Sequence, residues 1–230
     1  MKPFAVFDAD NASVLVRLER IDLLPRLFGQ VYMPDAIKKE LLDPMMYDLQ
    51  RVQEFAQNPP DWVIPKNPTT IDPTVLRAQI DRKLHAGEAA AISLAKELAQ
   101  DGSPGVVLSN EGGVRKFLNT REGQAQLRPG TDWSNWALDL KDQKTRDAPG
   151  NQRIFSANTW SVLCQAADRG LIHDFDSELA RAKTILTPSD KVQARLELFA
   201  SYWKEQRQQQ SLAQSPDRDH EHDRDHGHER

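Results

Sequence analysis

Residues 6–42 read VFDADNASVLVRLERIDLLPRLFGQVYMPDAIKKELL, and this stretch decides the fold class. The apolar run at residues 3–8 predicts a buried strand that is closed by Asp8. Leucine and valine recur at helical spacing over residues 13–28, which predicts an amphipathic helix directly after that strand. A strand followed by a helix is typical of an α/β fold.

The same alternation continues along the chain. Further strands are predicted at residues 31–33, 62–65, 105–109 and 153–156. Further helices are predicted at residues 34–42, 46–58, 87–100, 111–118 and 159–169, with others to about residue 210. Residues 66–73 read as a proline-rich loop. This alternation favours a three-layer α/β/α architecture, with a mostly parallel central sheet and helices on both faces.

The chain has 230 residues, enough for one α/β domain with appendages. We expect a single domain at residues 1–187 that carries a polar insertion at 119–152. A C-terminal helix at 188–212 and a His- and Asp-rich tail at 213–230, disordered by its composition, would follow. The four histidines of that tail could bind transition metals weakly, although a solvated, silent tail is the simpler interpretation.

The composition limits which cellular compartment and which binding partners we expect for this protein. No apolar run approaches the roughly 18 residues that cross a bilayer, and the N-terminus lacks a secretory cleavage pattern. The one cysteine, Cys164, cannot form an internal disulfide and is expected to pack in the core, so we expect a cytoplasmic protein without membrane contact. Residues 217–230 hold six acids against three arginines and so carry three of the four net negative charges. The folded body is therefore near neutral, and contact with nucleic acid would need a local basic patch.

Three carboxylates occupy positions that suit a metal site. Asp8 ends the first strand, Glu40 lies near the end of its helix, and Glu88 lies in the first turn of the helix at 87–100. Strand ends at one edge of a parallel sheet converge, and carboxylates that converge repel one another unless they share a divalent cation. Asn110 and Glu111 follow the strand at 105–109 and could join them.

Four strings in this order resemble the PIN-domain family, in the branch of toxin ribonucleases of the VapC type. The resemblance spans about residues 3–187, and its motifs are the opening 6–42, GEAAAI at 87–92, VVLSNEGGVRKF at 106–117 and TWSVLCQAADRGLI at 159–172. It implies a PIN-like fold and a metal-dependent endoribonuclease, in which water activated by Mg²⁺ or Mn²⁺ hydrolyses RNA phosphodiester bonds. It also implies a toxin–antitoxin system with a cognate antitoxin, and possible homodimers.

Carried over by position, the resemblance implies site residues in this chain. The catalytic set would be Asp8, Glu40, Glu88 and Glu111, and the metal ligands would be Asp8, Glu88, Asn110 and Glu111. The family usually has an aspartate where this chain has Asn110. An asparagine keeps a carbonyl ligand but loses a charge, so metal affinity should fall unless Glu111 or Asp10 substitutes.

Two other functions remain open. The loss of the acid at Asn110 and the insertion at 119–152 favour a non-enzymatic PIN-like module that binds RNA or protein. The Asp8-x-Asp10 spacing also resembles the start of haloacid-dehalogenase-like phosphatases, although the paired acids that such chemistry needs downstream are absent from VVLSNEGG. Each acid also has a structural explanation: Asp8 or Asp10 as a helix cap, Glu40 as a solvent-facing residue, and Glu88 as a stabilising acid at a helix N-terminus.

Overall fold

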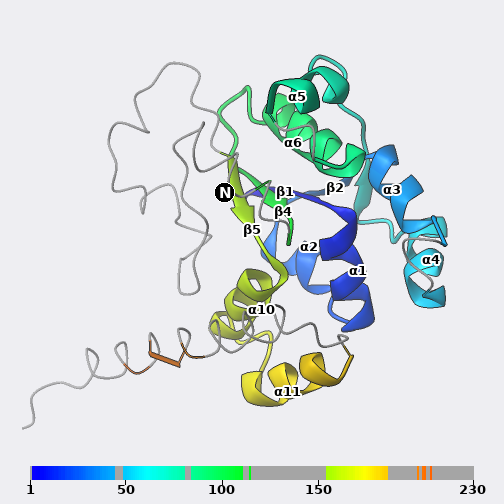
Figure 1. The fold of residues 1–230 in the computed structure, drawn as a ribbon. Coiled ribbons are helices and arrows are strands. Elements are labelled where there is room, and N and C mark those ends of the chain that lie inside the picture. Colours follow the sequence, from blue (N-terminus) through cyan, green and yellow to red (C-terminus); the bar gives the residue numbers. More distant parts are fainter. Residues whose placement is uncertain are drawn as a thin grey trace, which may run out of the picture.

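In the computed structural model, the described residues are 2–44, 49–80, 84–110, 114, 154–185, 201, 204, 205 and 208. Five strands form one sheet in the order β3-β2-β1-β4-β5 (Figure 1). Their bounds are β1 Phe4–Phe7, β2 Val31–Met33, β3 Val63–Pro65, β4 Gly105–Leu108 and β5 Ile154–Ala157. All four pairings are parallel, which confirms the predicted parallel sheet.

Helices cover both faces of this sheet and complete three layers (Figure 1). One core cluster joins the sheet to α1 Ala9–Arg17, α2 Leu23–Leu27, α3 Asp35–Leu41, α4 Gln50–Gln57, α10 Thr159–Asp168 and α11 Phe175–Ile185. A second core cluster on the opposite face joins it to α5 Pro73–Ile80 and α6 Ala86–Leu98. Neighbouring strand residues contribute to opposite clusters, as the two-residue period of a strand requires.

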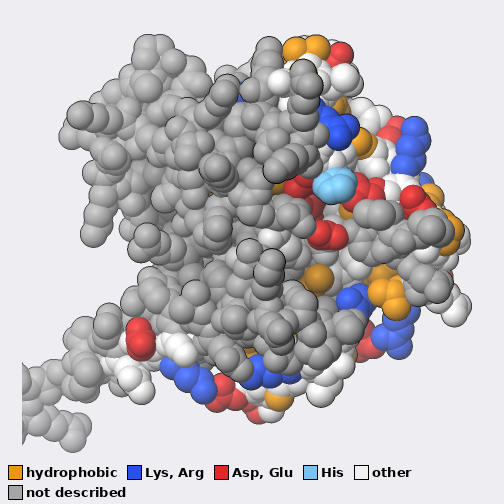
Figure 2. All heavy atoms as spheres, viewed as in Figure 1, with side chains coloured by type: hydrophobic (Ala, Val, Ile, Leu, Met, Phe, Trp, Pro, Cys, Tyr) orange, Lys and Arg blue, Asp and Glu red, His pale blue; other side chains and the backbone are white. Residues whose placement is uncertain are grey.

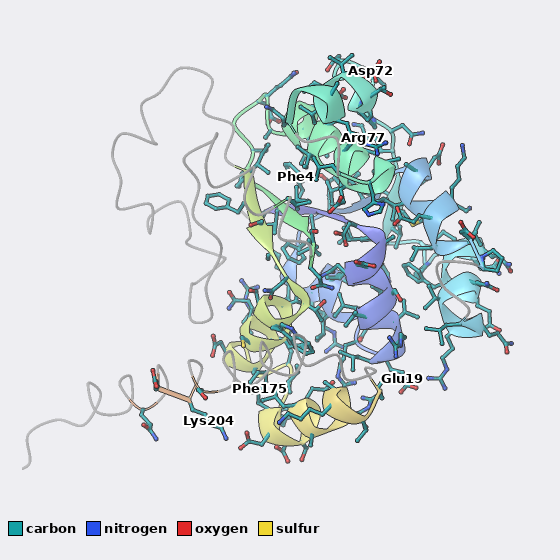
Figure 3. All side chains as sticks on the ribbon, viewed as in Figure 1. Phe4, Glu19, Asp72, Arg77, Phe175 and Lys204 are labelled. Atoms are coloured by element: carbon teal, nitrogen blue, oxygen red, sulfur yellow. The ribbon has the colours of Figure 1, made fainter. Side chains whose placement is uncertain are left out.

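The ring of Phe4 explains why β4 begins with a glycine. Phe4 is paired with Gly105 across β1 and β4, and a Cβ on Gly105 would lie 2.2 Å from the tip of that ring. The ring also meets Tyr32 edge to face, with their centroids 6.2 Å apart, on the side of the sheet that α5 and α6 cover (Figure 3). Gly105 therefore leaves the space that an aromatic core residue fills.

The single helix predicted at residues 13–28 is wrong, because two helices occupy this stretch. Helix α1 begins at Ala9 and ends at Arg17, and Glu19 then adopts a left-handed backbone with φ 53°. The N–H of Arg20 donates to the carbonyl of Leu15 at 2.8 Å, which closes the helix end in the way of a Schellman motif. The chain turns and starts α2, so that the leucines at 23, 24 and 27 remain buried.

Other element predictions are confirmed or need adjustment. The short strands at 31–33 and 62–65 and the helix at 87–100 are present within a residue or two. Helix α5 lies beyond the loop predicted at 66–73 and was not predicted. The predictions for 111–118, 119–152, 188–212 and 213–230 fall outside the described residues, apart from Val114, which is helical and buried, and four isolated positions after 200. Among the described residues no helix is long and apolar enough to cross a membrane.

Glu97 fixes the loop that leads into the unpredicted helix α5. Its carboxylate, on α6, accepts backbone N–H bonds from Thr69, Thr70 and Ile71 at 2.5 to 2.9 Å. Burial by itself raises the pKa of Glu97, but these N–H donors outweigh it and hold the pKa below its ordinary value. Glu97 thus orients the segment that places α5 against α6.

Candidate active site

Asp8 is a nearly completely buried carboxylate at the carboxyl end of β1. Its side chain is 2% exposed, and its Oδ1 accepts the N–H of Asn11 at 2.8 Å, so that Asp8 caps helix α1. The other oxygen, Oδ2, is buried with no hydrogen-bond partner of ordinary geometry. Burial raises the pKa of Asp8 well above its usual range. A hydrogen bond with the Ser109 side chain, longer or less aligned than an ordinary one, and the bond from the Asn11 N–H lower it, and the charges of Asp10 and Glu88 raise it further. Capping alone therefore explains only one of its two oxygens.

Glu88 brings a second buried carboxylate to the same region. It lies in the first turn of α6 and is 5% exposed, and its Oε2 accepts the backbone N–H of His85 at 2.7 Å. This bond is the structural role expected for an acid at a helix start. The charge of Glu88 raises the pKa of Asp8, so the carboxyl end of β1 and the start of α6 lie close together.

Glu40 is held against α6 by the absence of a side chain at Gly87. A Cβ on Gly87 would lie 2.5 Å from Glu40 Oε2 and 2.7 Å from Ile37 Cδ1, so both side chains of α3 rest directly on the α6 backbone. Burial raises the pKa of Glu40; His85 lowers it, and Asp10 and Asp43 raise it. Glu40 is thus a half-buried part of the cluster instead of a solvent-facing helix residue.

Asp10 joins these three acids. It lies in the first turn of α1, where Asp8, and not Asp10, caps the helix. Its charge raises the pKa of both Asp8 and Glu40. We refer to Asp8, Asp10, Glu40 and Glu88 as the acidic cluster. Figure 2 shows acidic side chains gathered around a histidine on the visible face.

Asn110 was expected to be a metal ligand, but its side chain makes hydrogen bonds with another element of the fold. Its Oδ1 accepts hydrogen bonds from the N–H and the hydroxyl of Thr159, at 3.0 and 3.1 Å. Thr159 Oγ1 also accepts a bond from Asn11 Nδ2 at 3.1 Å. The amide oxygen of Asn110 is therefore engaged in tying β4 to the start of α10. Glu111, predicted to be catalytic and a metal ligand, lies outside the described residues.

The acidic cluster fits a cation in its chemistry. Carboxylates that lie close enough to raise one another's pKa are the kind of donor that a hard divalent ion prefers. Within the described ranges, no three His, Cys, Asp or Glu side chains are already drawn together tightly enough to hold a metal ion.

The part of the chain that forms this cluster matches a known family. The model of a family described as a PIN domain, DUF3368, matches residues 4–118, half of the chain. The chain belongs to the PIN-domain family. The PIN domain is a nuclease fold. PIN domains generally use divalent metals, and membership of the family suggests RNA binding. No curated protein and no solved structure matches the chain.

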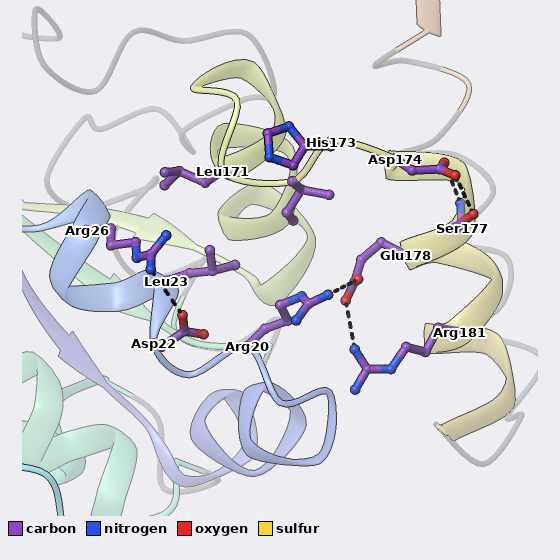
Figure 4. A pocket seen from close by; sticks show the side chains of 11 residues that line it. Arg20, Asp22, Leu23, Arg26, Leu171, His173, Asp174, Ser177, Glu178 and Arg181 are labelled. Atoms are coloured by element: carbon purple, nitrogen blue, oxygen red, sulfur yellow. Dashed lines mark hydrogen bonds and ion pairs between the residues drawn. The ribbon is translucent and has the colours of Figure 1, made fainter.

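A separate pocket lies at the far end of α1 in this PIN domain. It has a volume of about 420 Å³ and lies between the α1–α2 turn and the α10–α11 region (Figure 4). Arg20 binds Glu178 across it at 2.7 Å, while Arg26 and Arg181 pair with acids nearby. Because helix α1 separates it from Asp8, this pocket is not part of the acidic cluster.

Sequence reasoning missed two residues of the site: Gly87 was noted only as part of a motif, and Thr159 was read as the start of a helix. Asp10 was considered as a substitute for the acid missing at Asn110, with helix capping as the alternative. An acid two residues after a strand-end aspartate was the available signal for Asp10. Nothing local could indicate Thr159, which lies 49 residues from its partner Asn110.

Proposed function

We propose that this PIN domain is a metal-dependent endoribonuclease of the toxin type. The buried carboxyl of Asp8 supports it, because Asp10 and Glu88 act on this carboxyl and its Oδ2 makes no hydrogen bond of ordinary geometry. A polar atom left without a partner in the interior costs about 1–3 kcal/mol or more, and a bound cation would remove this cost. A binding site explains the arrangement more simply than a structural role does.

Asp8, Glu40 and Glu88 would hold Mg²⁺ or Mn²⁺, with Glu111 as a further carboxylate on the grounds of sequence. The ion would activate water and stabilise the charge that develops on an RNA phosphate. The chain's own carboxylates would orient that water and accept its proton. Pairing with a cognate antitoxin, homodimer formation and a cytoplasmic location belong to this proposal.

The test is cleavage of a mixed RNA pool with Mn²⁺, Mg²⁺ or EDTA. Asp8→Asn is the informative variant, because asparagine caps a helix as well as aspartate does but cannot provide a charge. Asp174→Asn is the matched control: Asp174 Oδ1 accepts the N–H of Ser177 at 2.9 Å at the start of α11, outside the cluster. We expect metal-dependent cleavage by the unchanged protein and by the control, and none by Asp8→Asn. Absence of cleavage by the folded, metal-loaded protein would reject the nuclease.

The second candidate is an RNA- or protein-binding module without catalysis. The engagement of Asn110 by Thr159 favours it, because the β4 edge then offers no free amide oxygen to a metal. RNA binding that is unaffected by EDTA and leads to no cleavage would select this candidate. The phosphatase hypothesis gains no support from the family match.

A further inference from the structure

The Asp8 carboxyl is held by hydrogen bonds from two neighbouring elements. Its Oδ1 accepts the N–H of Asn11 at 2.8 Å, at the start of α1. The side chain of Ser109, directly after β4, makes a second hydrogen bond with the same carboxyl, longer or less aligned than an ordinary one. The direction in which the Asp8 carboxyl points therefore depends on where the start of α1 and the end of β4 lie relative to each other.

Thr159, the first residue of α10, makes hydrogen bonds with both of these elements. Its hydroxyl accepts a bond from Asn11 Nδ2 at 3.1 Å. Its N–H and its hydroxyl donate to Oδ1 of Asn110, the residue after Ser109, at 3.0 and 3.1 Å. A hydroxyl has one proton and two lone pairs, so it can donate to Asn110 and accept from Asn11 at the same time. One side chain thus connects the two segments that hold Asp8.

We propose that Thr159 is a positioning residue of the candidate active site, which fixes the Asp8 carboxyl through Asn11 on one side and through Asn110 and the end of β4 on the other. This inference rests on the proposed function, because it assigns a further residue to the same site. Residues that orient a catalytic group from behind commonly change activity by about 10- to 100-fold. Thr159 lies beyond the family match, which ends at residue 118, and 148 residues after Asn11.

A purely structural role explains Asn11 poorly. This side chain is completely buried, and its Oδ1 makes no hydrogen bond with the described residues. A buried amide oxygen without a partner destabilises a fold, and an apolar side chain would fill the same space without this penalty. The bond from Asn11 Nδ2 to Thr159 is the contact that an apolar side chain could not make. Stability is therefore given up for a fixed link between α1 and α10, as expected where a functional carboxyl has to be preorganised.

The experiment measures kcat and KM for metal-dependent RNA cleavage by the full chain and by Thr159→Val, which has nearly the same shape but no hydroxyl. Thr159→Ser, which keeps the hydroxyl, is the rescue variant. The matched control is Ser161→Ala, because Ser161 also has a buried hydroxyl in the first turn of α10, but this hydroxyl donates to Asn158 Oδ1 at 3.1 Å and not to the residues that hold Asp8. Urea unfolding of each metal-free protein is the second readout, which separates lost activity from lost folding.

We expect Thr159→Val to lower kcat roughly 10- to 100-fold with little change in KM, because the Asp8 carboxyl is misplaced while RNA binding is kept. Thr159→Ser should cleave like the unchanged protein, and Ser161→Ala should lose stability to a similar degree as Thr159→Val without losing kcat. If the unchanged protein cleaves RNA, an unchanged kcat in Thr159→Val or an equal loss of kcat in Ser161→Ala would overturn the role of Thr159 alone. No cleavage by the folded, metal-loaded unchanged protein would overturn both this inference and the proposed nuclease.

Discussion

Gly87 shapes the acidic cluster through the side chain that it lacks. Its Cα faces Glu40 Oε2 and Ile37 Cδ1 so closely that any Cβ would collide with both. Both atoms are at the far ends of side chains that can rotate away. A substitution here should therefore move the Glu40 carboxylate without unfolding the protein.

Gly87→Ala should reduce Mn²⁺ affinity and RNA cleavage while changing the free energy of unfolding by no more than about 1 kcal/mol. The helix preference for alanine, about 0.5–1 kcal/mol, offsets the rotation of the displaced side chains. Calorimetry with Mn²⁺ and urea unfolding measure the two effects. In a Glu40→Ala background the same substitution should have no further effect on metal affinity. An equal loss of affinity in both backgrounds would show that Gly87 acts through something other than Glu40.

Asp8 predicts a pH dependence of stability with a definite sign. Its folded-state pKa is raised by burial, so the unfolded chain releases this proton at a lower pH than the folded protein does. The folded protein binds the extra proton in between, and stability therefore falls as pH rises from the ordinary aspartate range, about 4, through the raised pKa. Metal-free Asp8→Asn should be more stable than the unchanged protein at neutral pH and should depend less on pH.

Urea unfolding at a series of pH values, from about 4 to about 8, tests this prediction. Asp174→Asn is a control of opposite sign, because hydrogen bonds from Ser177 lower the pKa of Asp174, and the charged form therefore stabilises the fold above that pKa. Asp174→Asn should lose stability at neutral pH. The prediction fails if metal-free Asp8→Asn is the less stable protein at neutral pH. Added Mn²⁺ should reduce the difference in stability between Asp8→Asn and the unchanged protein, because it stabilises only the unchanged protein.

At the scale of elements, periodicity predicted most strands and helices but not where the helices break. The leucines of residues 13–28 keep helical spacing across a turn in which Glu19 is left-handed, a position usually taken by glycine or asparagine. Helix α5 was missed because a weakly amphipathic stretch follows a proline-rich loop. Its placement depends on Glu97, more than 20 residues later, which binds the N–H groups of that loop. Tertiary contacts decide both cases.

The Arg20–Glu178 pair joins two elements that are distant in sequence. Arg20 follows α1 and Glu178 lies in α11, where it is 5% exposed (Figure 4). Arg181 also pairs with Glu19, which extends the contact. Glu178 Oε1 already lacks a hydrogen-bond partner. Arg181 Nη1 lies 4.0 Å from that oxygen, so the closer of the two cations is Arg20.

Arg20→Met should lower the free energy of unfolding by up to about 3 kcal/mol, since it leaves a buried carboxylate with only the more distant Arg181. Arg20→Met combined with Glu178→Leu should cost less than Arg20→Met alone, because the isolated charge is then gone. Urea unfolding of the two single variants and the double variant gives the coupling energy. Additive losses would show that the two side chains contribute independently. RNA cleavage by the stable double variant should persist, because the pair lies away from Asp8.

At the scale of the whole molecule, the family match ends at an earlier residue than the folded unit does. The match ends at residue 118, but the sheet does not. Strand β5 pairs with β4 along its full length, and α10 contributes Trp160, Leu163 and Cys164 to the larger core cluster. Burial raises the pKa of the Cys164 thiol, as expected for a core cysteine. The fold class was predictable from the alternation of elements, and the strand at 153–156 and the helix at 159–169 that were predicted beyond residue 118 are present as β5 and α10.

A chain that ends at residue 118 should therefore fail to fold, although it contains the whole family match and all four acids of the cluster. It would expose the edge of β4 and the apolar surface that α10 covers, and it would leave Asn110 without Thr159. A chain that ends at Ile185 keeps these contacts, including the bond from Arg17 to the Ile185 carbonyl. Circular dichroism and a cooperative urea transition should distinguish the two. A cooperative transition in the shorter chain would show that β5 and α10 are additions to a PIN domain that is already complete, and that the acidic cluster is positioned without them.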